Sequence, residues 1–168
     1  IMMYSIFHVK GGIGKNILAT CVVSSLKRSD PERDIVIVTA HKEVWINNPN
    51  ITSTYNFKEI KTVHDTYIKN KDCKIFSQEP LFTEDFIKRK KHLILIWCDL
   101  CGVRWDNTLP QMYFHQEELD RVEEKMKKNV DKPILYLHTN GGSSQVRPYG
   151  WYRDLPTPNT VDIVNHFS

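Results

Sequence analysis

Three glycines and a lysine follow the first apolar run of the chain, and their spacing suits the binding of a phosphate. The residues are Gly11, Gly12, Gly14 and Lys15, followed by Asn16. Glycine lets the backbone come close to a ligand, and the helix expected from about Asn16 offers unpaired N–H groups to an anion. The segment therefore predicts a site for a phosphate-bearing or sugar-nucleotide ligand, and these five residues are its candidate groups.

One interpretation of this turn is the degenerate phosphate loop of a P-loop NTPase. The run Lys10–Lys15 resembles the deviant Walker A loop of the chromosome-partition ATPases. That loop also needs a glycine where this chain has Val9, and a Ser or Thr on Mg²⁺ where it has Asn16. The strand expected at 34–39 ends without an acidic residue, and Asp99, the remaining Walker B candidate, follows a run with helical character. We therefore expect an open glycine loop that does not wrap phosphate tightly, and keep nucleotide hydrolysis as an alternative.

Other residues that could do chemistry are dispersed along the chain. His8, at the end of the first expected strand, is the titratable group nearest the turn, and histidine suits proton transfer near neutral pH. Cys98 and Cys101 have CxxC spacing, but no second pair completes a zinc site, so we expect buried free thiols. The histidines form no i, i+4 pair or His-x-His cluster, and no metal site is predicted. A second glycine turn and its aromatic neighbourhood supply further candidate substrate-binding residues: Asn140, Gly141, Gly142, Trp151 and Arg153.

Apolar periodicity predicts that an α/β fold, a Rossmann-like three-layer parallel sheet, positions these residues. Tyr4–Val9 and Asp34–Thr39 are unbroken apolar runs, as expected of adjacent central strands covered on both faces. Ile17–Arg28, between them, has helical spacing. Weaker patterns predict strands at Ile51–Phe57, Cys73–Phe76, Gln111–Phe114 and Ile134–His138, and helices at Thr62–Lys69, from Thr83 through Trp97 to near Gly102, at Glu117–Asn129 and at Thr160–Phe167.

Length and composition narrow the class of protein. The 168 residues are 40% hydrophobic and 26% charged, which suits one globular domain, or one domain and part of another. A net charge of +3 is too small to indicate a nucleic-acid partner. No apolar run approaches the ~20 residues of a transmembrane helix, and four scattered cysteines are typical of a reducing compartment. We therefore expect a cytoplasmic chain without a transmembrane segment.

Two segments of the chain resemble glycosyltransferase family 9, the heptosyltransferase-like enzymes. The first segment resembles the opening of the family, which has a glycine turn, an apolar helix, a leucine-lysine ending, a proline-acid pair and a second strand. Here the turn is Gly14-Lys15, the helix contains Ala19-Thr20-Cys21 and ends in Leu26-Lys27, the proline-acid pair is Pro31-Glu32, and the second strand is Ile35–Val38. The step Asn48-Pro49-Asn50-Ile51 resembles the family's next feature. The second segment resembles the opening of the family's C-terminal domain, in Lys132–Gly142 and Tyr149–Pro156.

The resemblance implies a GT-B fold, in which two Rossmann-like domains enclose the active site. Residues 1–131 would be the N-terminal, acceptor-side domain, and 132–168 the first βα unit of a truncated C-terminal, donor-side domain. The longer parent would transfer a sugar from a nucleotide-sugar to a glycan or lipid-linked acceptor, without a metal cofactor, and the fragment alone would be inactive. It could lie peripheral to a membrane. We expect the tail Ile134–Ser168 to dock on the first sheet or to pair with a second copy in a homodimer.

The chain departs from the family where the family has its proposed general base. An aspartate follows the turn glycine in the family, whereas this chain has Lys15. A protonated lysine cannot accept a proton, although it could hold an acceptor phosphate or carboxylate. His8 is then the alternative base, unless a base is lacking. A non-catalytic Rossmann-like binding module remains a third hypothesis beside the glycosyltransferase and the NTPase.

Overall fold

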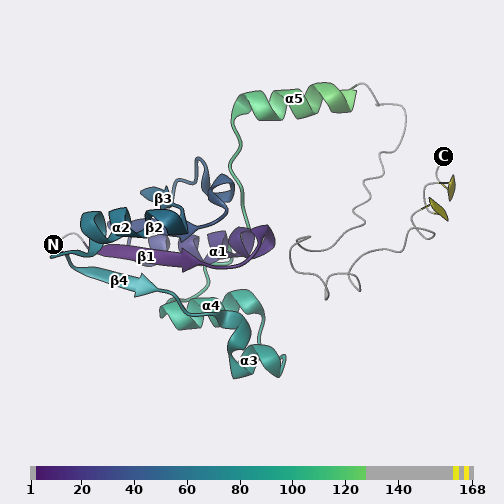
Figure 1. Ribbon diagram of the computed structural model, residues 1–168. Coiled ribbons are helices and arrows are strands. Elements are labelled where there is room, and N and C mark those ends of the chain that lie inside the picture. The colour runs from purple at the N-terminus through teal and green to yellow at the C-terminus, as the bar shows by residue number, and fades with distance from the viewer. Residues whose placement is uncertain (1–2, 128–160, 163–164, 167–168) are drawn as a thin grey trace. The chain divides into compact units, whose positions relative to one another are not determined.

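A four-stranded parallel sheet organises the first part of the chain (Figure 1). The computed structural model describes residues 3–127, 161–162 and 165–166. The strands are β1 (Tyr4–Val9), β2 (Asp34–Thr39), β3 (Ser53–Tyr55) and β4 (Cys73–Phe76), in the order β3-β2-β1-β4. Every pairing is parallel, and β1 and β2 are the two central strands. The predicted α/β fold class and the adjacency of the first two strands are therefore confirmed.

The helical segments along the chain are α1 (Ile13–Ser29), η1 (Lys42–Trp45), η2 (Phe57–Glu59), α2 (Ile60–Val63), the π-helical turn η3 (His64–Ile68), η4 (Pro80–Phe82), α3 (Glu84–Ile87), α4 (Leu93–Cys101) and α5 (Gln116–Lys127). Those that pack against the sheet lie on both of its faces. Side chains of β1 alternate between the two faces. Phe7 and Val9 join the core cluster of α1 and α4, whereas Ile6 joins Val63 and Tyr67 of α2 and η3. The result is the three-layer arrangement expected for a parallel sheet.

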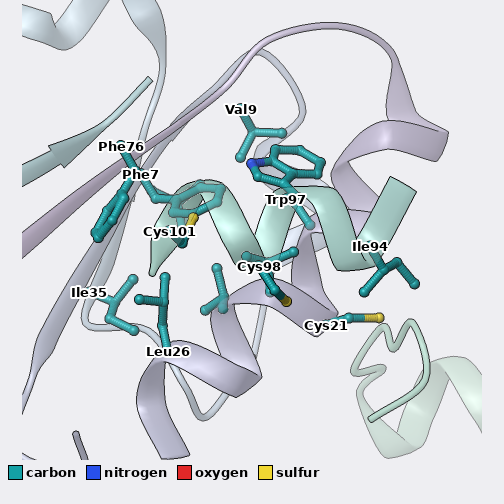
Figure 2. Close-up of a cluster of buried hydrophobic side chains, with 14 of the residues drawn as sticks. Phe7, Val9, Cys21, Leu26, Ile35, Phe76, Ile94, Trp97, Cys98 and Cys101 are labelled. Carbon is teal, nitrogen blue, oxygen red and sulfur yellow. The ribbon is translucent and has the colours of Figure 1, made fainter. Parts of the chain in front are cut away.

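The larger core cluster contains the cysteines and the tryptophan of α4 (Figure 2). Trp97 lies with its ring centroid 5.8 Å from that of Phe7, and both side chains are buried. Cys98 and Cys101 are buried free thiols, as predicted. Burial raises the pKa of Cys98 to about 11 and that of Cys101 to about 12. The CxxC pair is therefore part of the packing and carries no reactive thiolate at neutral pH.

Several predicted boundaries were wrong. The helix predicted from Thr83 through Trp97 is two helices, α3 and α4, separated by Lys88–His92. This segment has four consecutive cationic residues and no apolar position to pack, and Arg89 takes a left-handed conformation with φ 53°. Gln111–Phe114 is not a strand, because the Gln111 N–H donates to the side chain of Thr20 on α1, at 3.0 Å, instead of to another strand.

Other boundaries shift by a few residues. Helix α1 begins at Ile13 instead of about Asn16, and the strand predicted at Ile51–Phe57 is shorter. The strand predicted at 134–138 lies outside the described residues. Within the helix predicted at 160–167, the four described residues are helical.

The chain divides into two compact units, Ile1–Leu119 and Asp120–Ser168. The division falls within α5. The predicted domain boundary between residues 131 and 132 lies outside the described residues and stays a prediction. The sheet and the residues discussed below belong to the first unit.

Candidate functional site

The strand order places a topological switch point beside β1. From β1 the chain continues to β2 and β3 on one side, and β4 then adds to the other side of β1. Ligands of open parallel sheets bind outside the carboxyl ends of the strands at such a point, because the loops there diverge. The two loops concerned here follow β1, at residues 10–12, and β4, at residues 77–79.

The loop after β1 carries the glycines that the sequence indicates. Gly11 has φ 101°, a conformation that favours glycine, and a Cβ at this position would lie 3.1 Å from Cδ of Lys15. Gly12 is the N-cap of α1 and provides no side-chain cap for the first-turn N–H groups. Gly14 lies in the first turn of α1, so the expectation of three glycines in one open loop was wrong for this residue. Gly11 and Gly12 form the loop, and Gly14 lies in the first turn of the helix.

Lys15 joins the two loops at the switch point. Its Nζ donates to a carboxylate oxygen of Glu79, and the two charges form an ion pair. The same Nζ lies 5.4 Å from the ring centroid of Trp97. The side chain of Lys15 is 12% exposed and that of Glu79 is 22% exposed. A cation and a carboxylate are therefore held together, partly shielded from water, at the edge where ligands of this kind of sheet bind.

Glu79 is the residue of this site that sequence reasoning missed. It follows β4 by three residues and is the N-cap of η4, where its Oε1 accepts the Leu81 N–H at 3.4 Å. The available signal was an acidic residue just after a predicted strand. Glu79 contacts Lys15, 64 positions earlier in the chain, because β4 pairs with β1. No local sequence pattern predicts that pairing.

The side chain of Asn16, predicted to contact the ligand, points into the protein. Its Oδ1 accepts hydrogen bonds from Oγ1 of Thr39, at 2.6 Å, and Nε1 of Trp45, at 3.1 Å. Its Nδ2 donates to the Gly12 carbonyl at 3.1 Å. Asn16 is fully buried. The amide thus ties α1 to β2 and η1, and both of its ends are occupied.

His8 lies on the other face of the sheet from Lys15. Strand alternation places it with Ile6, and its ring packs edge-to-face on Phe57, with centroids 6.4 Å apart. Burial lowers its pKa, and the positive charge of Lys10 lowers it further. Its Nε2 has no hydrogen-bond partner among the described residues. The structure therefore does not bring this candidate base together with Lys15 and Glu79.

Asp99, considered as a Walker B residue, is exposed on α4. Its carboxylate pairs with Lys91 at 2.9 Å, on a helix instead of at a strand end. The second candidate turn, at residues 140–142, and the candidates at 151 and 153 lie outside the described residues.

A pocket of about 900 Å³ begins one helical turn from Lys15. Leu18, three residues along α1, lines it together with Leu81, which is two residues beyond Glu79. Phe86, Ile87 and Leu93 complete an apolar wall, and the basic segment 89–92 lies at its side. The pocket thus combines apolar and cationic groups, and two of its lining residues are close in sequence to the members of the ion pair.

Over residues 3–127, 161–162 and 165–166, no three His, Cys, Asp or Glu side chains are grouped so that they could hold a metal ion. In the same residues, no helix has the length and apolarity to cross a bilayer. A scan against protein-family models and searches of curated proteins and of solved structures found no match to this chain.

Proposed function

We propose that this chain is the acceptor-side part of a glycosyltransferase, which transfers a sugar from a nucleotide-sugar to a glycan or lipid-linked acceptor. The observation that carries the proposal is the pair formed by Lys15 and Glu79 beside the glycine loop. The pair lies at the carboxyl edge of the sheet, at the switch point, where Rossmann-like domains bind their ligands. Its two charges suit the two tasks of an acceptor site, which are to hold an anionic group and to accept a proton.

Glu79 takes the role of general base in this scheme. The acceptor hydroxyl gives its proton to the Glu79 carboxylate while its oxygen bonds to the anomeric carbon of the donor sugar. The bond from that carbon to the diphosphate oxygen breaks, and the nucleoside diphosphate leaves with the electron pair. Lys15 stands where the family that this sequence resembles has an aspartate, so the carboxylate comes from the neighbouring loop. His8, on the other face of the sheet, takes no part.

The neighbouring pocket supports an acceptor with both apolar and anionic parts. Leu18 and Leu81 lead from the ion pair into it, and Arg89 stands beside the apolar wall. A sugar face or a lipid anchor can lie against apolar side chains, and the cations can meet acidic groups of the acceptor.

The contacts of Asn16 argue against the NTPase alternative. An Mg²⁺-binding residue at this position would have to turn its oxygen toward the phosphates, but this oxygen accepts two internal hydrogen bonds. A calorimetric titration with ATP and Mg²⁺ should therefore show no site tighter than about 1 mM, equivalent to ~4 kcal/mol. Micromolar binding that is lost in Lys15→Ala would overturn the glycosyltransferase proposal in favour of the NTPase.

Saturation-transfer NMR tests the proposed function directly. The probes are a panel of nucleotide-sugars, sugar phosphates, acidic sugars and neutral sugars. We expect a saccharide of the panel to bind, and its signal to disappear in Lys15→Met. Lys10→Met is the matched control, because it removes an exposed lysine from the loop that precedes the helix of Lys15. Equal losses in both variants, or no saccharide binding at all, would contradict the proposal.

A further inference from the structure

The Lys15–Glu79 pair points to a specific class of ligand group. We propose that Lys15 binds an oxyanion of the ligand, a phosphate ester or a carboxylate, in exchange for the Glu79 carboxylate. The exchange frees Glu79 beside the bound ligand. The inference rests on the proposed function for the sugar part of the ligand, whereas the oxyanion chemistry follows from the pair itself.

Lys15 is held in place before any ligand arrives. Gly11 leaves room for the methylene chain of Lys15, since a Cβ there would lie 3.1 Å from Cδ. The Lys15 ammonium group also lies over the ring of Trp97, 5.4 Å from its centroid. A lysine that is already ordered loses little further side-chain entropy on binding an anion. Only the partner of its ammonium group has to change.

Glu79 is a partner that an incoming oxyanion can replace. Its carboxylate and a ligand phosphate or carboxylate offer the same kind of charged acceptor oxygens to an ammonium group. Besides Lys15, the Leu81 N–H donates a long hydrogen bond to this side chain, at 3.4 Å. The side chain is 22% exposed, so a freed carboxylate can turn toward water or toward a hydroxyl of the ligand.

A permanent structural pair would behave differently when Glu79 is neutralised. Neutralisation would lower the stability of the fold, and in the wild-type chain a permanent pair would keep the Lys15 ammonium group from any added anion. An exchange site predicts a gain of anion affinity, because the oxyanion no longer competes with an internal carboxylate. Binding of the anion at Lys15 in the wild-type chain, together with the gain in Glu79→Gln, therefore separates the two.

The test is an NMR titration of the full chain with ¹³C-labelled lysine, at pH 7 and constant ionic strength, using inorganic phosphate and acetate as separate probes. We expect Glu79→Gln to bind at least one probe about tenfold more tightly than wild type does. The shift should report on Lys15 and vanish in Lys15→Met. The more tightly bound probe distinguishes a phosphate ester from a carboxylate.

Glu84→Gln is the matched control, because it removes the same charge from a glutamate that pairs with Lys88 and Lys90 and not with Lys15. Its affinity should equal that of wild type. Glu79→Asp keeps the charge on a shorter side chain and should show a smaller gain. An affinity of Glu79→Gln within twofold of wild type, an equal gain in Glu84→Gln, or a Glu79→Gln chain that does not fold would each overturn the exchange.

The two proposals fail in different ways. Phosphate exchange without any saccharide binding would overturn the glycosyltransferase proposal and leave the oxyanion site standing. Saccharide binding that depends on Lys15, together with unchanged phosphate affinity in Glu79→Gln, would overturn the exchange and leave the proposed function standing.

Discussion

Replacing Asn16 by alanine tests whether this residue supports the site from inside or contacts the ligand. The substitution leaves two buried donors without an acceptor, the Trp45 indole N–H and the Thr39 hydroxyl. Both residues are buried, with exposed fractions of 2% and 0%. An unsatisfied buried polar group costs about 1–3 kcal/mol, and the Thr39 hydroxyl can rotate toward another acceptor, so we expect a loss of about 3 kcal/mol of unfolding free energy. For a chain of this length that corresponds to a fall in Tm of about 10 °C.

Urea denaturation followed by circular dichroism measures this loss for Asn16→Ala. Gln78→Ala is the control, because it removes an exposed amide, and should change the stability by less than about 0.5 kcal/mol. Asn16→Thr restores the hydroxyl of a phosphate loop, yet should be destabilised as well and gain no affinity for ATP with Mg²⁺. A fully stable Asn16→Ala with weakened ligand binding would refute this reasoning, since the amide would then belong to the ligand and not to the interior.

Three further predictions concern charge, thiols and glycines. Hydrogen bonds from Thr108, Ser24 and Ser25 outweigh the effect of burial and lower the pKa of Asp106. The contribution of Asp106 to stability is therefore present above pH ~4 and is lost as the pH falls through the folded pKa. Asp106→Asn should flatten that part of a pH–stability curve, and an unchanged slope would contradict the assignment. In a thiol-labelling experiment on the native chain, we expect half-buried Cys73 to react rapidly. The buried thiols should react only after unfolding; they are Cys21, Cys98 and Cys101. Fast labelling of more than one thiol would contradict this expectation and show that the core opens. Gly11→Ala should lower the unfolding free energy by about 1–2 kcal/mol in the same urea assay, because Gly11 has a positive φ and a Cβ there would crowd Lys15. Gly14→Ala should raise it by ~0.5 kcal/mol, because Gly14 lies in helical backbone with open space around it. Equal effects of the two substitutions would contradict the loop geometry.

The central strands could be predicted because burial on both faces leaves a strong local signal. Tyr4–Val9 and Asp34–Thr39 have apolar side chains at nearly every position, and β1 and β2 coincide with them. The helix predicted through Thr83 to Trp97 failed for a local reason as well. Its apolar positions recur at helical spacing on both sides of Lys88–His92. The charged run between them has no apolar side chain to pack, and Arg89 has a left-handed backbone conformation that interrupts the helix.

The candidate site could be predicted only in part. The glycine turn was visible because glycine at a strand-to-helix junction has a local meaning, and Lys15 followed from its position in that turn. The role of Asn16 was not visible, since a polar residue at the start of a helix is as compatible with a ligand contact as with an internal bond. Its partners, Thr39 and Trp45, come from β2 and η1 and are brought there by the fold.

Glu79 shows how the fold changes the interpretation of Lys15. Considered in sequence alone, a lysine where the family that this sequence resembles has an aspartate removes the proton acceptor and weakens the case for catalysis. In the structure β4 lies beside β1, and the loop after β4 brings a carboxylate to the lysine ammonium. The acid and the cation are thus both present at the switch point, but they come from adjacent loops instead of one. If the oxyanion exchange holds, ligand binding itself separates them and frees Glu79 beside the ligand. If the proposed glycosyltransferase function holds as well, the freed carboxylate lies beside the acceptor hydroxyl, which is the arrangement that proton transfer requires.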